Sequence, residues 1–319
     1  MRVGFIGLGN VGAKLAGTLL RNDVDLMIRD LDKNAAEPLL QEGAKWANSP
    51  KEMAENCDLI ITCLPSPAIS AAVMESDDGI LAGMRDGMIW AEMSTTDEAE
   101  VKRLGAIVEA KGGHAVDCPV SGGCHRAATG NIAIFAGCER PVFEAMLPYL
   151  TKMGRRILHT GPLGSASVLK VVTNYLATAN LVSCSEALAT CQAAGMDLNT
   201  SFEAIKISSG NSFVHETESQ VILNGSRDIN FTMDLVLKDI GLFDEVAKRA
   251  GLDLELSPLL ISLFKKAIAK YGEREFSPNI IKLIEEPAGL DITAPGFPAE
   301  ILDDEPEEPG YEVVPTGRA

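Results

Sequence analysis

Two polar side chains of an otherwise apolar segment, Lys170 and Asn174, are the first candidates for chemistry in this sequence. They are four residues apart, so on a helix both project from one face. The apolar positions of the segment recur at helical spacing, at residues 168, 171, 172, 175, 179 and 182. A buried amine costs free energy unless it has a partner or a task, so the pair is a candidate for moving a proton. A solvated surface lysine is the alternative, which this segment alone leaves open.

A glycine-rich turn near residue 10 has the spacing of a dinucleotide-binding motif. It reads Gly7-Leu8-Gly9-Asn10-Val11-Gly12, and it follows a predicted strand and opens a predicted helix. In this motif Gly7 permits a tight turn, Gly9 lets a pyrophosphate approach the backbone, and Gly12 allows close packing of helix on strand. The phosphates are then expected at the positive N-terminus of the helix.

Asp30 follows Gly12 by eighteen residues, at the end of the second predicted strand. An acid at this spacing accepts hydrogen bonds from ribose hydroxyls and repels a 2′-phosphate, so the sequence favours NAD over NADP. Arg29 keeps NADP as an alternative. Asp32 is a second candidate for the ribose, although it is equally placed to cap a helix that begins at Lys33.

Two further loops follow predicted strands. The run from Thr62 to Ser66 ends a strand of the same sheet, so Leu64 and Pro65 are expected to border the cofactor. Asp117-Cys-Pro-Val leads into Ser121, Gly122 and Gly123. Backbone N–H groups of two glycines beside a hydroxyl can form a concave anion site that suits a carboxylate; a plain turn is the other interpretation.

The elements that must position these residues alternate in the first half of the chain. Strands are predicted at Arg2–Ile6, Asp25–Ile28, Leu59–Cys63, Met88–Glu92, His114–Asp117 and Ile132–Ala136, and helices near Val11–Arg21, Lys33–Glu42, Pro50–Glu55, Ile69–Met74, Asp97–Lys111 and Arg140–Tyr149. Such alternation predicts an α/β fold with a doubly wound, mostly parallel sheet of the Rossmann type.

After Gly161 the strand signals stop and helical periodicity dominates. We predict a very long first helix from Ser165, then helices near Ser201–Ser208, Thr217–Leu223, Thr232–Ala250, Ser257–Lys270 and Pro278–Leu283. The expected domains are a dinucleotide-binding domain at 1–163, an all-helical substrate and oligomerisation domain at 164–286, and an acidic, extended or disordered tail at 287–319 with six prolines.

Composition excludes several classes of function. The net charge of -17, of which the segment 285–319 carries -9, argues against nucleic-acid binding. Polar residues interrupt the apolar stretch 168–194, so no membrane span is expected. The seven cysteines lack metal or disulfide spacing, and no secretory signal is evident, so we expect a cytoplasmic protein without a metal site.

Four ordered segments together resemble the β-hydroxyacid dehydrogenases, the family of 3-hydroxyisobutyrate dehydrogenase. They are GLGNVG at 7–12, DCPVSGG at 117–123, GPLGSASVLKVVTN at 161–174 and LVLKDIGL at 235–242. The resemblance covers residues 1 to about 285. It implies an NAD-dependent enzyme that forms a homodimer or homotetramer around the long helix.

The resemblance also implies residue roles. Lys170 matches the family's catalytic lysine and Asn174 its neighbouring substrate-site asparagine, while Ser121 to Gly123 match the substrate-carboxylate loop. Thr95, in a serine–threonine segment after Met93, would line the nicotinamide pocket. Lys238 matches a lysine that reaches the cofactor, and Asp239 is expected to be structural.

Two positions depart from the family pattern. Ala166 stands where a second glycine is usual, which leaves the start of the helix undefined. Arg126, beside the anion loop, occupies a position that is often small. We hypothesise that Arg126 binds a second anionic or polar group of the substrate; a solvated arginine is the alternative.

The chemistry implied is hydride transfer between the nicotinamide and the hydroxyl-bearing carbon of a small 3-hydroxycarboxylic acid, giving the semialdehyde or ketoacid. Lys170 would act as general acid and base, with its pKa lowered by burial and by the nearby nicotinamide. Two alternatives remain: an imine reductase, which generally has another residue at the lysine position, and a non-catalytic dinucleotide-binding scaffold.

Overall fold

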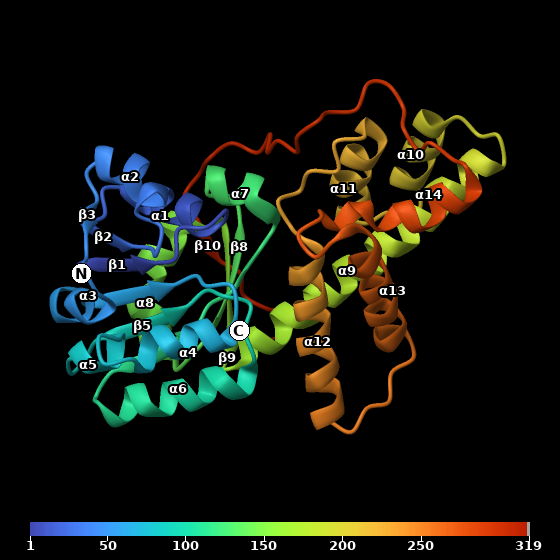
Figure 1. Cartoon of the computed structure of the whole chain (residues 1–319). Helices are drawn as coiled ribbons and strands as arrows, with labels where there is room; N and C mark the ends of the chain where they lie inside the picture. Colours follow the sequence, from blue (N-terminus) through green and yellow to red (C-terminus); the bar gives the residue numbers. More distant parts are fainter. Residues whose placement is uncertain (318–319) are drawn as a thin grey trace. The chain divides into compact units, whose positions relative to one another are not determined.

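The computed structural model describes residues 1–317, so Arg318, the single base of the acidic segment, lies outside the described residues. The chain divides into two compact units. The first contains residues from Met1 to Lys170 and the segment from Asp303 onward, and the second contains Val171–Leu302. The chain therefore passes from one unit to the other twice, within the long helix and again after Leu302 (Figure 1).

A mostly parallel sheet forms the centre of the first unit (Figure 1). Its strands, in spatial order, are β10 (Tyr311–Glu312), β9 (Arg156–Gly161), β8 (Ala133–Gly137), β6 (His114–Asp117), β5 (Ile89–Glu92), β4 (Leu59–Thr62), β1 (Val3–Ile6), β2 (Leu26–Arg29) and β3 (Lys45–Trp46). The short β7 (Val120–Ser121) and β6 pair antiparallel with β8. The strand order reverses at β1, which is where doubly wound sheets bind ligands.

The register brings the carboxyl ends of four neighbouring strands level with one another. Ile6 pairs with Thr62, Thr62 with Glu92 and Glu92 with Asp117. Because these strands are parallel, the residues that follow them emerge at one edge of the sheet. The glycine turn, the loop with Leu64, the loop with Ser94 and the loop that leads to Ser121 all begin there.

Helices cover both faces of this sheet. They are α1 (Gly12–Arg21), α2 (Glu37–Gln41), α3 (Pro50–Asn56), α4 (Pro67–Glu75), α5 (Ile80–Gly83), α6 (Glu98–Ala110), α7 (Gly123–Thr129) and α8 (Arg140–Met153). Successive strand residues alternate between two cores. Ile61 packs with Leu15 of α1, whereas Ile60 packs with Met53 of α3 on the other face.

The second unit is helical. It holds most of α9 (Ser165–Ala193), followed by α10 (Leu198–Lys206), α11 (Phe213–Asn224), α12 (Met233–Arg249), α13 (Leu256–Tyr271) and α14 (Lys282–Ala288). Leu188, Ile222 and Phe264 lie at its core. The predicted Rossmann-type unit followed by an all-helical unit is thus confirmed. The boundary differs from the predicted 163/164, because the first turn and a half of α9 belong to the first unit.

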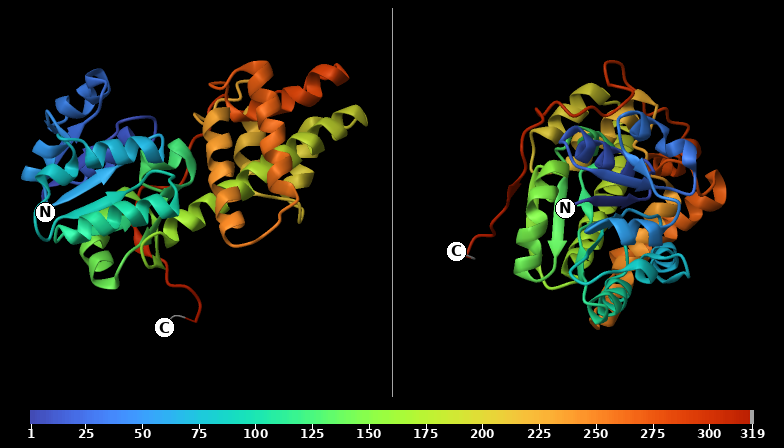
Figure 2. Two further views of the ribbon diagram at one scale, coloured as in Figure 1. Left: turned by 60° about the horizontal axis from the view of Figure 1, so that its bottom comes forward. Right: turned by 90° about the vertical axis from the view of Figure 1, so that its left-hand side faces the viewer.

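The acidic segment after Ala288 is not a tail that stands away from the fold. Its first part packs on the helical unit, where Ile292 is buried and the Phe297 ring meets Phe202 edge-on at 5.0 Å. From Asp303 the chain runs along the first unit, and β10 pairs in parallel with β9 (red in Figures 1 and 2). The composition cannot build a core of its own, but it fits onto surfaces that the two units supply.

One carboxyl group inside the helical unit is buried in surroundings that disfavour its ionised form. Oε2 of Glu218, on α11, is buried and has no hydrogen-bond partner among the described residues. Burial raises the pKa of Glu218 to about 8. The pKa of a glutamate in an unfolded chain is about 4.3. Between about pH 4.3 and pH 8 the unfolded chain therefore ionises this carboxyl, whereas the folded protein keeps it protonated.

We therefore expect Glu218→Gln to stabilise the protein increasingly as the pH rises. Below about pH 4 both states of the wild type hold the proton, and the cost is absent. From there to about pH 8 the gain should grow by up to about 1.4 kcal/mol per pH unit, and then level off. Melting temperatures from pH 5 to 9 measure it, with the exposed Glu216→Gln on the same helix as control. A gain that shrinks with rising pH would contradict this.

Candidate active site

The glycine turn after β1 is shaped for a close ligand. Gly7 has a φ of +98°, and a Cβ there would lie 2.2 Å from the Cys63 carbonyl oxygen. A Cβ on Gly12 would lie 2.0 Å from the Gly7 carbonyl oxygen, whereas one on Gly9 would meet nothing within 4 Å. Two glycines thus serve the fold, and the third leaves open space beside the N-terminus of α1. The first turn of α1 has neither an acidic residue nor a side-chain cap, so this turn fits a pyrophosphate.

Asp30 lies beside this turn, at the end of β2. Its carboxylate accepts hydrogen bonds from the backbone N–H of Leu8 at 2.6 Å and of Asp32 at 2.9 Å. Asp32 caps the following 3₁₀ turn by accepting from Asn34 at 3.0 Å. The Arg29 guanidinium donates to the carbonyl oxygens of residues 47 and 48. Of the three charged side chains, that of Asp30 is the one with a hydrogen bond to the glycine turn, whereas Arg29 meets the turn through its backbone carbonyl oxygen, which accepts from the Gly7 N–H at 3.0 Å.

A buried network links the loops after β4 and β5. The Leu64 N–H donates to Ser94 Oγ at 2.7 Å, and the Ser94 N–H and hydroxyl both donate to Glu92 Oε1. Glu92 is fully enclosed, and burial raises its pKa. Glu92 thereby positions the loop that carries Leu64 and Pro65, next to the half-buried Thr95. Sequence reasoning gave Glu92 no role; an acid two residues before a serine at a strand end is the signal available.

The predicted anion loop has a backbone that requires glycine. Ser121 ends β7, Gly122 has a φ of +134° and Gly123 a φ of +86°, and α7 begins at Gly123. Residues other than glycine rarely adopt a positive φ, and two in succession are rarer still. Consecutive N–H groups in such a turn can form a concave site for an oxyanion.

Asp117 ties the end of β6 to the start of α9. Its carboxylate accepts from the N–H of Gly164 at 2.8 Å, the N–H of Ser167 at 2.7 Å and the Ser167 hydroxyl at 2.9 Å. Burial raises the pKa of Asp117, and these hydrogen bonds oppose that rise. The helix begins at Ser165, which defines the start that Ala166 left open. One turn further along α9, Lys170 is only 8% exposed.

In the second unit, Asp239 holds two predicted site residues. Its carboxylate accepts from Asn174 Nδ2 and from Lys238 Nζ, each at 2.6 Å. A carboxylate can only accept, so the contact also defines which end of the Asn174 amide is the nitrogen. Asp239 is buried, and its carboxylate links α12, which carries it, to α9. It was expected to be structural, and it sets the orientation of both neighbours.

Arg126, on α7, lies against the anion loop. Its Cδ is 3.2 Å from where a Cβ on Gly122 would be. The guanidinium Nη2 donates to Glu305 Oε1 at 3.0 Å. The arginine that was hypothesised to bind an anionic group of the substrate is therefore already paired with a carboxylate of the acidic segment. Sequence reasoning did not connect Glu305 with this loop, because 179 residues separate the two side chains.

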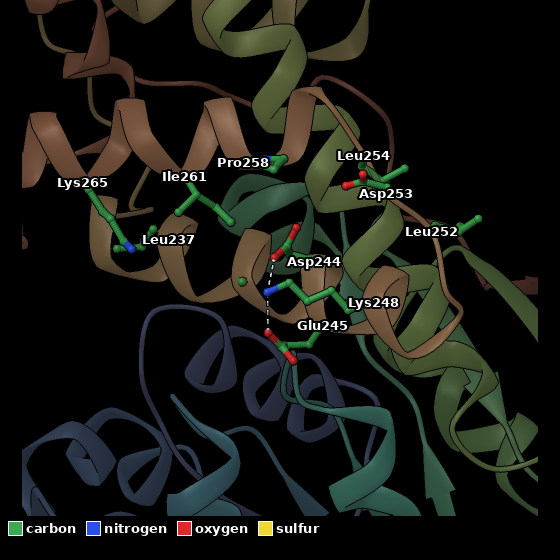
Figure 3. Close-up of a pocket in the computed structure, with 11 residues that line it drawn as sticks. Leu237, Asp244, Glu245, Lys248, Leu252, Asp253, Leu254, Pro258, Ile261 and Lys265 are labelled. Atoms are coloured by element: carbon green, nitrogen blue, oxygen red, sulfur yellow. Dashed lines mark hydrogen bonds and ion pairs between the residues drawn. The ribbon is translucent and has the colours of Figure 1, made fainter.

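A surface hollow of the helical unit lies elsewhere. It measures about 520 Å³ and is lined by α12, α13 and the loop that joins them (Figure 3). Lys248 points into it and pairs with Asp244 and Glu245. None of the predicted site residues lines this hollow.

Among residues 1–317, no group of three or more His, Cys, Asp or Glu is placed to hold a metal ion. Across that same range, no helix has the length and apolarity to cross a membrane.

The fold and the comparisons that follow define a dinucleotide-dependent oxidoreductase. Residues 2–161 match the family model of the NAD binding domain of 6-phosphogluconate dehydrogenase. Residues 164–284 match that of the NAD-binding domain of NADP-dependent 3-hydroxyisobutyrate dehydrogenase. The chain belongs to the β-hydroxyacid dehydrogenase family, as the resemblance of its four motifs predicted.

Several relatives are similar over nearly their full length. 2-(Hydroxymethyl)glutarate dehydrogenase of Eubacterium barkeri is 31% identical over 92% of this chain and 98% of its own. NAD-dependent L-serine dehydrogenase of Pseudomonas aeruginosa is 32% identical over 86% and 95%. The crystal structure of 3-hydroxyisobutyrate dehydrogenase from Salmonella typhimurium has a TM-score of 0.79 and 28% identity, covering 89% of this chain and 99% of that one. An imine reductase from Myxococcus stipitatus, at 17% identity and a TM-score of 0.62, shares the fold alone.

The contrast between two glycines gives a test of the cofactor turn. Gly9→Ala adds a methyl group to open space, so we expect unchanged thermal stability and an NADH Kd raised about tenfold, which is ~1.4 kcal/mol. Gly12→Ala forces its Cβ against the Gly7 carbonyl and should cost about 1–3 kcal/mol of folding stability. Fluorescence titration with NADH and thermal melts measure the two effects. Equal NADH affinity of Gly9→Ala and wild type would argue against pyrophosphate binding at this turn.

Proposed function

We propose that this protein is an NAD-dependent oxidoreductase that interconverts a small 3-hydroxycarboxylic acid and its semialdehyde or ketoacid. Lys170 is its general acid and base. The observation that carries the proposal is the burial of Lys170, one helical turn before Asn174 on a helix whose start Asp117 anchors to the sheet. Burying a lysine to this degree costs free energy unless a partner or a task compensates for it.

The cofactor supplies the hydride chemistry when bound, and the protein supplies orientation and a path for the proton. The turn from Gly7 to Gly12, with Leu8, Asn10 and Val11 between the glycines, holds the pyrophosphate. Asp30 takes the adenosine ribose. In our proposal Leu64, Pro65 and Thr95 contact the nicotinamide side, and Lys238, held by Asp239, binds the cofactor as well.

The preference for NAD over NADP is supported by two contacts. Asp30, which lies beside the glycine turn, would repel a 2′-phosphate. Arg29, the cation that would favour NADP, donates to two backbone carbonyls near β3.

The substrate carboxylate is bound by Ser121 and the N–H groups of Gly122 and Gly123. Lys170 takes the hydroxyl proton during oxidation and returns it during reduction. Asn174 hydrogen-bonds the substrate without adding charge. Because Asp239 fixes its amide, Asn174 offers the substrate a defined orientation. Arg126 extends this binding surface, with its charge balanced by Glu305.

A panel of small 3-hydroxy acids tested with NAD and with NADP, by absorbance of the reduced nicotinamide, tests the proposal. We expect turnover with at least one acid, and a higher kcat/KM with NAD. Reduction of cyclic imines without oxidation of any acid would instead support the imine reductase alternative. NADH binding without any turnover would support the scaffold.

We further infer a cytoplasmic homodimer or homotetramer. Support for the compartment comes from the seven cysteines, none of which forms a disulfide within residues 1–317. Support for assembly comes from the 29-residue α9, longer than a small domain needs, and from apolar side chains exposed near the start of α13, among them Leu252 and Leu259. Light scattering coupled to size-exclusion chromatography measures the assembly.

A further inference from the structure

We propose that Glu305 is a specificity-determining residue: it neutralises Arg126 beside the anion loop and so restricts the enzyme to substrates with a single carboxylate. This inference rests on the proposed function and adds the charge class of the substrate. It makes part of the acidic C-terminal segment a component of substrate selection.

The position of Arg126 is the first step. Its Cδ packs over Gly122, the middle residue of the loop that binds the substrate carboxylate in our proposal. The side chain is three-quarters buried, and it extends from α7, which begins within that loop. A guanidinium can hold a carboxylate through two parallel hydrogen bonds. Arg126 is therefore suited to receive a second carboxylate from a substrate whose first one lies on the loop.

Glu305 already supplies that carboxylate. Its Oε1 accepts from Arg126 Nη2 at 3.0 Å, and its Oε2 lies 3.5 Å from Arg156 Nη1. A dicarboxylate substrate would have to displace Glu305 or place its second charge beside it. Like charges in close juxtaposition disfavour the wrong partner, which is how such sites discriminate.

The surrounding contacts hold Glu305 in place. Asn131 Nδ2 donates to the Glu305 carbonyl oxygen at 2.8 Å and to Asp303 Oδ2 at 2.7 Å, and Thr129 also donates to Asp303. Asn131 is almost fully buried. The segment is thus anchored on both sides of Asp304, through the side chain of Asp303 and the backbone of Glu305, and the Glu305 side chain starts from a defined point.

The segment lies beyond the part of the chain that the family defines. The family models end at residue 284, and the Salmonella typhimurium structure is covered almost completely by 89% of this chain. Other carboxylates of the segment also meet arginines of the first unit: Glu307 pairs with Arg21, Glu308 with Arg155 and Glu312 with Arg140. Among these carboxylates, Glu305 is the one whose arginine packs on the anion loop. We therefore assign substrate selection to Glu305, and attachment of the segment to the first unit to the other three.

The test compares two acids that differ by one charged arm, 3-hydroxyisobutyrate and 2-(hydroxymethyl)glutarate. Glu305→Gln removes the negative charge that faces Arg126, and Glu308→Gln removes an equivalent carboxylate of the same segment as the matched control. The readouts are kcat/KM for each acid, and the Kd of each acid by calorimetry with NADH-saturated protein. Thermal melts check that each variant is folded.

We expect Glu305→Gln to improve kcat/KM and Kd for the dicarboxylate at least tenfold relative to the monocarboxylate, and Glu308→Gln to change neither ratio. Adding Arg126→Ala to Glu305→Gln should abolish the gain. Equal ratios in Glu305→Gln and wild type, the same gain in Glu308→Gln, or a gain that survives Arg126→Ala would each overturn the inference. If the wild type oxidises no hydroxy acid, the proposed function fails, and the calorimetric ratio still decides the role of Glu305.

Discussion

Lys170→Ala is expected to lower kcat by roughly 10²–10⁴-fold, the usual contribution of a general acid or base, while the Kd for NADH stays within a factor of about two. The amine is buried on α9, and no other group in our proposal moves the proton of the substrate hydroxyl. Steady-state kinetics with the best acid of the panel and fluorescence titration with NADH measure the two quantities.

A second substitution separates proton transfer from charge. Lys170→Arg keeps a cation at this position, but a guanidinium does not lose its proton in proteins. We expect this variant to be as slow as Lys170→Ala. Turnover restored by arginine would show that Lys170 acts through its charge alone, and retained turnover of Lys170→Ala would remove it from the mechanism.

Among the substitutions that destabilise the protein, Asp117→Ala is expected to cost the most folding stability. It leaves two backbone N–H groups and a hydroxyl at the buried start of α9 without their acceptor, which should cost about 3 kcal/mol. Since Lys170 lies one turn further along, kcat should fall as well. Denaturant unfolding and kcat measure these effects.

The control for Asp117 is a second helix cap. Asp197 caps α10 by accepting from Thr200 N–H at 2.8 Å, at an exposed position. Asp197→Ala should cost about 1 kcal/mol and leave kcat unchanged. If Asp117→Ala destabilised the protein no more than Asp197→Ala does, the anchoring of α9 to β6 would be of little consequence.

The sequence predicted the strands that pack on both faces, because they are short runs of large apolar residues. It missed β9 at Arg156–Gly161, whose run Arg-Ile-Leu-His-Thr-Gly mixes polar and apolar residues. β9 lies between β8 and the two-residue β10 near the edge of the sheet, so only part of it is buried. β3 and β7, of two residues each, are too short to leave a pattern in the sequence.

The sequence names the candidate site residues, but not the residues that support them. Glycine spacing and the acid at Asp30 predict a dinucleotide site. Asp117 and Asp239 act through partners that are distant in sequence, such as Gly164 for Asp117 and Asn174 for Asp239, and Glu92 reaches the loop with Leu64 only through Ser94. Which residues meet across neighbouring strands depends on the pairing register of those strands, and the composition of a segment does not reveal that register. For the same reason Glu305 was counted as one acid of a tail.

The pairing of β10 with β9 has a consequence for solubility. A bare edge strand presents unpaired N–H and C=O groups that can recruit a strand from another molecule. Here the Tyr311 N–H and the Val313 N–H donate to the backbone of residues 155 and 157. Gly310 allows this close approach, since a Cβ there would lie 2.0 Å from the Gly154 carbonyl oxygen. A chain cut after residue 284 would keep both matched family regions and lose this cover, leaving the edge of β9 open to intermolecular strand pairing.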